Sequence, residues 1–115
     1  MNFNDYQKRA LSTDLGAGKS NKYAHDPAYV DKILSFVGEA GEVAEKYKKI
    51  IRDKGGVINK EDKQEIVKEI GDVLWYIAIL ADYLGVSLDE LAQANVDKLA
   101  SRNKRGKLGG KGDNR

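Results

Sequence analysis

The fold is decided by one apolar stretch, Lys68-Glu-Ile-Gly-Asp-Val-Leu-Trp-Tyr-Ile-Ala-Ile-Leu-Ala81. Apolar residues recur in and around it with the spacing of a helix face: Ile66, Ile70, Val73, Leu74, Ile77, Ala81 and Leu84. From Val73 to Leu80 this helix is apolar almost all round, so it must be covered on every side. Four helices of one chain would supply too little cover. We therefore expect a homo-oligomer, with Trp75 and Ile79 near the subunit contact.

The remainder of the chain is also predicted to be helical. It contains one proline in 115 residues and is rich in Ala, Leu, Glu and Lys, which is typical of an all-α protein. We expect four helices forming a bundle, at residues 2–14, 27–53, 60–84 and 87–103. Cap and turn signals separate them: Asp26-Pro27, Gly55-Gly56, Asn59, Gly85 and Ser87.

Composition limits the class of protein. The length suits one domain, which we place at residues 1–103, followed by a basic, glycine-rich tail at 104–115. The absence of cysteine excludes disulfides and thiolate metal ligands. No apolar run has the length of a membrane span, so we expect a cytoplasmic protein without a membrane partner. The tail lacks the interleaved aromatic residues of a nucleic-acid-binding module, which argues against a nucleic-acid partner.

Two pairs of carboxylates are the candidate functional residues. Glu39 and Glu42 are three residues apart on the second helix, as are Glu69 and Asp72 on the third, so each pair shares a helix face. Clustered carboxylates repel one another unless a cation compensates, and Mg²⁺ prefers oxygen ligands. The single histidine, His25, argues against zinc and against a di-iron bundle. Ordinary solvated surface acids are the alternative interpretation.

Three glycines accompany these acids inside the predicted helices: Gly38, Gly41 and Gly71. A glycine in a helix interior costs about 1 kcal/mol relative to alanine. Their presence indicates either a close approach of two helices or room for a ligand.

The order of the polar motifs resembles that of a known family. Glu39-x-x-Glu42, Glu69-x-x-Asp72 and Asn95-x-x-Lys98, in a four-helix chain of this length, are similar to those of the MazG-like nucleoside triphosphate pyrophosphohydrolases of the all-α NTP pyrophosphatase superfamily. The resemblance covers about residues 30–103. It implies a MazG-like four-helix bundle that assembles as a homodimer or homotetramer.

The resemblance also implies roles for individual residues. The four acids, Glu39, Glu42, Glu69 and Asp72, would bind Mg²⁺ or Mn²⁺, whereas Asn95 and Lys98 would contact nucleotide or phosphate. Arg102, in the basic region, would reach substrate phosphates. Tyr76 lies one turn beyond Asp72 on the same face, which makes it a candidate for stacking on the base, while Trp75 is assigned to packing.

The general base is less well defined. Many relatives carry an acid immediately before the first metal-binding glutamate, but this chain has Gly38 there. Glu39, Glu45 and a water activated by the metal alone all remain candidates.

The function we expect is metal-dependent hydrolysis of a nucleoside triphosphate to the monophosphate and pyrophosphate, in nucleotide-pool house-cleaning. The alternative is a non-catalytic helical protein that binds nucleotide or acts as a regulatory scaffold. The sequence does not specify the base or the sugar.

Overall fold

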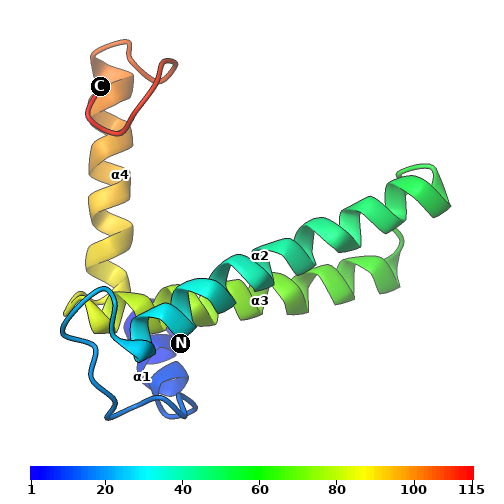
Figure 1. Cartoon of the computed structure of the whole chain (residues 1–115). Coiled ribbons are helices and arrows are strands. Elements are labelled where there is room, and N and C mark those ends of the chain that lie inside the picture. Colours follow the sequence, from blue (N-terminus) through cyan, green and yellow to red (C-terminus); the bar gives the residue numbers. More distant parts are fainter.

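The structure, a computed structural model, describes residues 1–115 and consists of four helices without strands (Figure 1). The helices are α1 (Phe3–Leu11), α2 (Pro27–Lys54), α3 (Lys60–Tyr83) and α4 (Leu88–Lys104). The predicted all-α class is confirmed. The bounds of α2, α3 and α4 each agree with the prediction to within one residue.

The first helix ends earlier than predicted. We expected it to reach residue 14, but α1 ends at Leu11 because the next residues fold into turns. The Thr13 amide donates to the carbonyl of Ala10, and the Asp14 carboxylate accepts from the amide of Gly16 at 2.8 Å. This turn brings Asp14 against Lys32 of α2, which a continued helix would not do.

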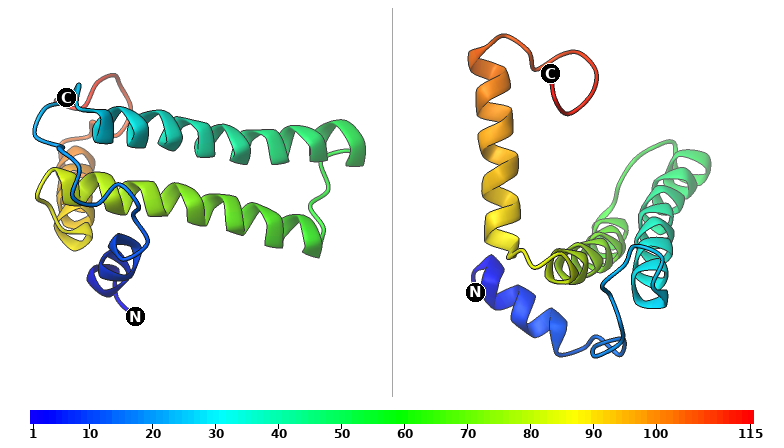
Figure 2. Two further views of the ribbon diagram at one scale, coloured as in Figure 1. Left: turned by 60° about the horizontal axis from the view of Figure 1, so that its bottom comes forward. Right: turned by 60° about the vertical axis from the view of Figure 1, so that its left-hand side comes forward.

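The second and third helices form an antiparallel hairpin (Figure 2). Gly55 ends α2 with a φ of 61°, a conformation that favours glycine. Asn59 begins α3 with a capping box, in which its side chain and that of Asp62 each accept from the other's backbone amide. Lys54 and Asp62 then pair across the turn at 2.6 Å.

The main core lies at one end of this hairpin, where α1 and the start of α4 cover α3. The buried apolar residues there are Ala10, Ala78, Ile79, Ala81 and Leu88. Ile79 has no exposed surface, and Trp75 packs against the same cluster from the side. The expectation that Ile79 faces another subunit is therefore wrong, because its own chain covers it completely. Trp75 is only half-buried, so its place near a subunit contact stays a prediction.

A buried glutamine on α1 holds the junction between α3 and α4. The Gln7 side-chain amide donates to the carbonyls of Ala78 at 3.1 Å and Val86 at 3.2 Å. Its oxygen accepts from the backbone amide of Leu88 at 3.0 Å. One side chain thus satisfies backbone groups on both sides of the turn that ends at Ser87.

The fourth helix leaves α3 at an angle of 98°. Gly85, with a φ of 73°, lies in the turn between them. Figures 1 and 2 show α4 standing clear of the α2–α3 hairpin, so the four helices do not form the predicted bundle within a single chain. No single helix is long and apolar enough to cross a membrane, and only α3 and α4 taken together, as a bent pair, reach that length and composition.

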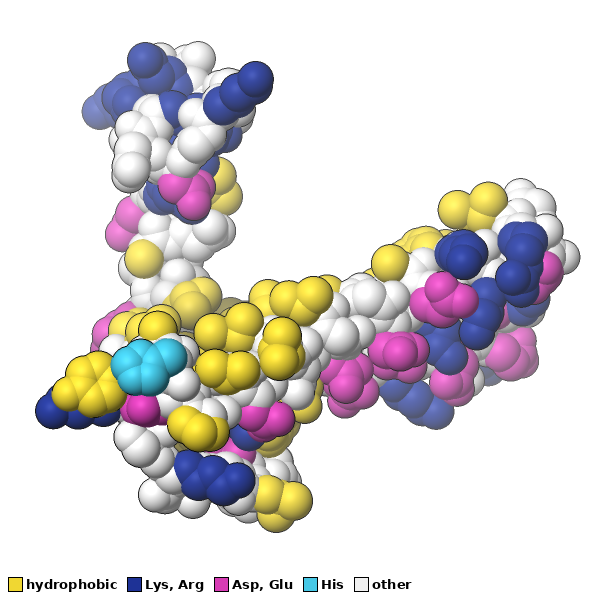
Figure 3. All heavy atoms as spheres, viewed as in Figure 1, with side chains coloured by type: hydrophobic (Ala, Val, Ile, Leu, Met, Phe, Trp, Pro, Cys, Tyr) yellow, Lys and Arg dark blue, Asp and Glu magenta, His cyan; other side chains and the backbone are white.

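Much apolar surface remains uncovered, because only 12 of 115 residues are buried. Figure 3 shows apolar side chains gathered over the first half of α2. We call this surface the α2 apolar face and define it by four exposed residues, Val30, Ile33, Leu34 and Val37. Exposed apolar patches of this kind commonly mark contacts with other molecules.

Candidate active site

Three of the four predicted metal ligands come together between α2 and α3. Carboxylate oxygens of Glu39, Glu69 and Asp72 all lie within 4.8 Å of one another. Glu39 comes from α2, and the other two lie one turn apart on α3. Glu39 and Glu69 are half-buried, whereas Asp72 is exposed. A set of oxygen atoms at this spacing suits a hard divalent cation.

The other two acids predicted for the site on α2, Glu42 and Glu45, stand outside this cluster. Glu42 is exposed and lies one turn beyond Glu39. Glu45 pairs with two lysines of its own helix, Lys48 at 3.9 Å and Lys49 at 3.8 Å. Of the two candidate bases, the structure therefore places only Glu39 in the acid cluster.

The charge of the cluster is poorly compensated by the protein itself. Partial burial, followed by the charges of Asp72, Glu69 and Glu42, raises the pKa of Glu39 above its ordinary value. Lys46 of α2 is the one basic side chain within 4.0 Å of these carboxylates, with its Nζ 4.0 Å from Glu69 Oε1. Crowded carboxylates of this kind gain from binding a cation.

The three glycines leave open space beside the acids. A Cβ atom added at Gly38, Gly41 or Gly71 would meet no atom within 4 Å. The interpretation that they permit a close approach of two helices is therefore wrong within the chain. The alternative interpretation, room for a ligand, agrees with the open surface at these positions.

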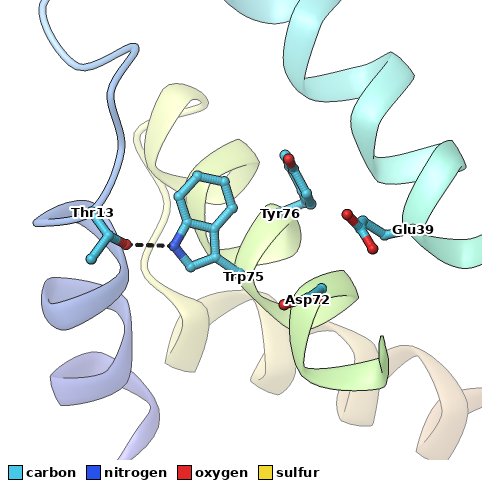
Figure 4. Close-up of a pocket in the computed structure, with 5 residues that line it drawn as sticks. All are labelled: Thr13, Glu39, Asp72, Trp75 and Tyr76. Atoms are coloured by element: carbon cyan, nitrogen blue, oxygen red, sulfur yellow. Dashed lines mark hydrogen bonds between the residues drawn. The ribbon is translucent and has the colours of Figure 1, made fainter. Parts of the chain in front are cut away.

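A cavity opens directly beside the acid cluster (Figure 4). It has a volume of 330 Å³ and is lined by Thr13, Glu39, Asp72, Trp75 and Tyr76. Glu39 and Asp72 form its acidic side. The rings of Trp75 and Tyr76 form an aromatic side, meeting edge to face with their centroids 4.8 Å apart.

The cavity includes one predicted substrate residue and two that were not predicted. Tyr76 was expected to face substrate, and it lines the cavity. Trp75 was assigned to packing, yet it lines the cavity as well as packing on the core. Thr13 was not considered, and its Oγ1 accepts a hydrogen bond from Trp75 Nε1 at 2.8 Å.

The predicted phosphate-binding residues lie elsewhere, on α4. Asn95 is exposed, while Lys98 and Arg102 are held by the C-terminal segment. Lys98 Nζ lies 3.1 Å from Asp113 Oδ1, and Arg102 Nη2 lies 3.2 Å from the same oxygen. Arg102 is only 3% exposed, and its Nε has no hydrogen-bond acceptor. None of the three lines the cavity of its own chain.

The basic tail is folded back on α4 in the structure. The ion pairs with α4 are those of Asp113. Within the tail, the Arg115 guanidinium donates to the carbonyls of Lys107 at 3.1 Å and Leu108 at 2.9 Å. Lys and Arg side chains cluster at this end of α4 in Figure 3. The tail thus carries basic side chains and also Asp113, whose carboxylate pairs with Lys98 and Arg102 of α4.

The paired acids on a helical hairpin agree with the family resemblance of the sequence, and comparison with known proteins confirms it. The profile of the MazG nucleotide pyrophosphohydrolase domain matches residues 31–106, so the chain belongs to this family. It is 45% identical over 117 residues to the Gene 37 protein of Mycobacterium phage L5, with all of both chains covered.

A second relative matches a shorter part of the chain. The Uncharacterized protein YvdC of Bacillus subtilis (strain 168) is 52% identical over 42 residues, which cover 36% of this chain and 40% of that protein. No solved structure matches the chain.

Proposed function

We propose that this protein is a cytoplasmic enzyme that hydrolyses a nucleoside triphosphate to the monophosphate and pyrophosphate, with Mg²⁺ or Mn²⁺ as cofactor, in nucleotide-pool house-cleaning. Family membership supports the pyrophosphohydrolase activity in general. The observation that carries the proposal is the cluster of Glu39, Glu69 and Asp72 at the mouth of a cavity with an aromatic side. The acids suit the metal and phosphates, and the aromatic rings suit the base.

The donor atoms of the cluster fit the proposed cofactor. All are carboxylate oxygens, the ligands that Mg²⁺ and Mn²⁺ prefer. Glu42, one turn from Glu39, is the fourth acid of the proposed metal set. A bound cation would supply charge stabilisation at the phosphates and a water of lowered pKa.

We assign the role of proton acceptor to Glu39. It lies in the cluster and lines the cavity, whereas Glu45 is paired with lysines. In the proposed reaction the oxygen of water bonds to the α-phosphorus and its proton passes to Glu39. The bond between the α-phosphorus and the bridging oxygen breaks, and that oxygen leaves with the pyrophosphate.

We further propose that the site is completed by a second copy of the chain in a homodimer or homotetramer. The α2 apolar face is uncovered, and α4 diverges from α3 by 98°. Association would bury the apolar face and bring α4 of one copy toward the acid cluster of another. Lys98 and Arg102 would then neutralise phosphate charge, and Asn95 would orient the nucleotide.

The proposal is tested by measuring pyrophosphate release from a panel of ribo- and deoxynucleoside triphosphates, with and without Mg²⁺ or Mn²⁺. We expect metal-dependent formation of the monophosphate that is lost in Glu69→Gln. The matched control is Glu65→Gln, because Glu65 lies one turn earlier on α3 and pairs only with Lys68. Nucleotide binding without turnover of any substrate would instead support the non-catalytic nucleotide-binding scaffold.

A further inference from the structure

The indole of Trp75 is fixed from two sides by other parts of the chain. Its Nε1 donates to Thr13 Oγ1, in the turn after α1, at 2.8 Å. On α2, Lys32 Nζ lies 5.6 Å from the indole ring, within the range of a cation–π contact. The rings of Trp75 and Tyr76 are nearly perpendicular, with their centroids 4.8 Å apart. The orientation of one aromatic ring in the cavity therefore depends on three separate elements.

Lys32 is itself held by a buried ion pair. Its Nζ lies 2.8 Å from Asp14 Oδ1, and the two side chains are only 7% and 1% exposed. The other carboxylate oxygen accepts from the Tyr83 hydroxyl at 3.0 Å, and the Gly16 amide donates to Oδ1 at 2.8 Å. These contacts fix the turn after α1 to both α2 and α3. The turn carries Thr13, so the ion pair and the Thr13 hydrogen bond position Trp75 together.

On the side of the cavity formed by Trp75, the indole N–H and the Thr13 hydroxyl already form hydrogen bonds within the protein. Trp75 Nε1 donates to Thr13, and the Thr13 hydroxyl donates in turn to the carbonyl of Ala10 at 2.8 Å. The Trp75 side of the cavity therefore offers an aromatic surface rather than a hydrogen-bond donor. Stacking on such a surface is tolerant of base identity, because every nucleobase has a π face.

We propose that Trp75 is the surface on which the nucleobase of the substrate stacks, and that Thr13 and the Asp14–Lys32 pair are its positioning residues. This inference rests on the proposed function, because phosphates held at the acid cluster place the remainder of the nucleotide in the same cavity. On the Trp75 side the base is recognised by its flat face and not by hydrogen bonds to its edge.

The molecule carries its own probe for this contact, since Trp75 is the single tryptophan of the chain. The probes are α,β-methylene analogues of adenosine and cytidine triphosphate, with inorganic tripolyphosphate as the matched ligand without a base. All are added with Mg²⁺, and calorimetry confirms binding. We expect both nucleotide analogues to quench Trp75 emission in a saturable way, and tripolyphosphate to bind without quenching. Binding of the analogues with unchanged emission would overturn the proposal.

Variants give a second, independent readout. Removing a stacking surface for one base should raise KM about tenfold. We expect that rise in Trp75→Leu, with kcat within about twofold and tripolyphosphate affinity unchanged, whereas Trp75→Phe retains most of the affinity. Thr13→Val, which removes the acceptor for the indole, should raise KM less, and Thr13→Ser should restore it.

The outcomes separate this inference from the function on which it rests. Turnover with a wild-type KM in Trp75→Leu would overturn the stacking role and leave the pyrophosphohydrolase intact. Nucleotide-specific quenching without turnover of any triphosphate would overturn the enzyme and retain the base-binding surface. If Thr13→Ser raises KM as much as Thr13→Val does, although it keeps a hydroxyl, the positioning role of Thr13 would be overturned.

Discussion

The Asp14 carboxylate and the Lys32 ammonium form an ion pair of 2.8 Å that is almost completely closed to solvent. Breaking such a pair by removing one partner leaves an uncompensated buried charge, which is strongly destabilising. We expect Asp14→Asn to lower the free energy of unfolding by about 3 kcal/mol. Denaturation in urea, followed by circular dichroism, measures the change.

A matched control exists at the same lysine. Asp31 lies 3.5 Å from Lys32 Nζ, but its side chain is 68% exposed. Exposed ion pairs contribute little, so Asp31→Asn should change the free energy of unfolding by less than about 1 kcal/mol. Equal effects of the two substitutions would contradict the importance of burial here.

The same pair predicts acid sensitivity. Burial alone would raise the pKa of Asp14, but hydrogen bonds from Lys32, Gly16 and Tyr83 outweigh it and hold the pKa below its ordinary value of 3.8. A depressed carboxylate pKa contributes stability that is present above about pH 4 and is lost as pH falls through the folded-state pKa. The free energy of unfolding of the wild type should therefore fall more steeply below about pH 4 than that of Asp14→Asn. Parallel curves in urea titrations across this range would refute the linkage.

Metal affinity should depend on pH through Glu39. Partial burial and the nearby carboxylates, Asp72 first, raise its pKa, so protons compete with the cation as pH falls toward that pKa. We expect Mg²⁺ to bind more weakly at acidic pH, and Glu39→Gln to bind about tenfold more weakly with a flatter pH profile. Calorimetric titration at several pH values measures both. Chelation of the metal should abolish turnover.

Gln7 should be a sensitive position although it belongs to neither the acid cluster nor the cavity. Its three hydrogen bonds join backbone groups of Ala78, Val86 and Leu88. Gln7→Leu leaves these buried groups without partners, which should cost about 3 kcal/mol of stability. The control is Gln93→Leu on the exposed surface of α4, where the side chain only reaches Asp97 and the expected change is within about 0.5 kcal/mol. Thermal unfolding distinguishes the two.

The proposed assembly is tested at the α2 apolar face. Leu34 is 67% exposed there, and Leu34→Lys would place a charge in the proposed contact. We expect light scattering after gel filtration to show a dimer or tetramer for the wild type and a monomer for Leu34→Lys. Leu15, which is 99% exposed in the loop after α1, provides the control Leu15→Lys, expected to retain the oligomer.

Local patterns in the sequence predicted the features that depend only on neighbouring residues, namely helix ends and the spacing of side chains on one helix. The capping box of Asn59 and the left-handed Gly55 act within a few positions, and both helix ends lie where the sequence places them. The spacing of Glu69 and Asp72 on one helix face likewise needs no tertiary information. Even so, Asp26 shows the limit of such patterns. It precedes Pro27 as expected, yet its carboxylate accepts from Ser20 and Tyr23 instead of capping α2.

Contacts between distant positions could not be predicted in this way. The partners Thr13 and Trp75 belong to different elements, and a lone threonine after a helix gives no signal of a place in the cavity. Lys46 lies one turn beyond Glu42 on the same helix, but it reaches Glu69 on α3. The start of α4 is held by buried Gln7, and glutamines are mostly exposed in proteins, so the sequence carries no signal of this contact.

The right-angled departure of α4 has a mechanical consequence. The start of α4 is held by the hydrogen bond of Gln7 to Leu88, and Lys98 lies further along the same helix. At about 1.5 Å of rise per residue, Lys98 lies roughly 15 Å from Leu88, so a tilt of about 10° would move it about 2.6 Å. That displacement is as large as a hydrogen bond is long. The position of Lys98 is therefore set where α4 begins, and small changes of packing there would be amplified at Lys98, the proposed phosphate contact.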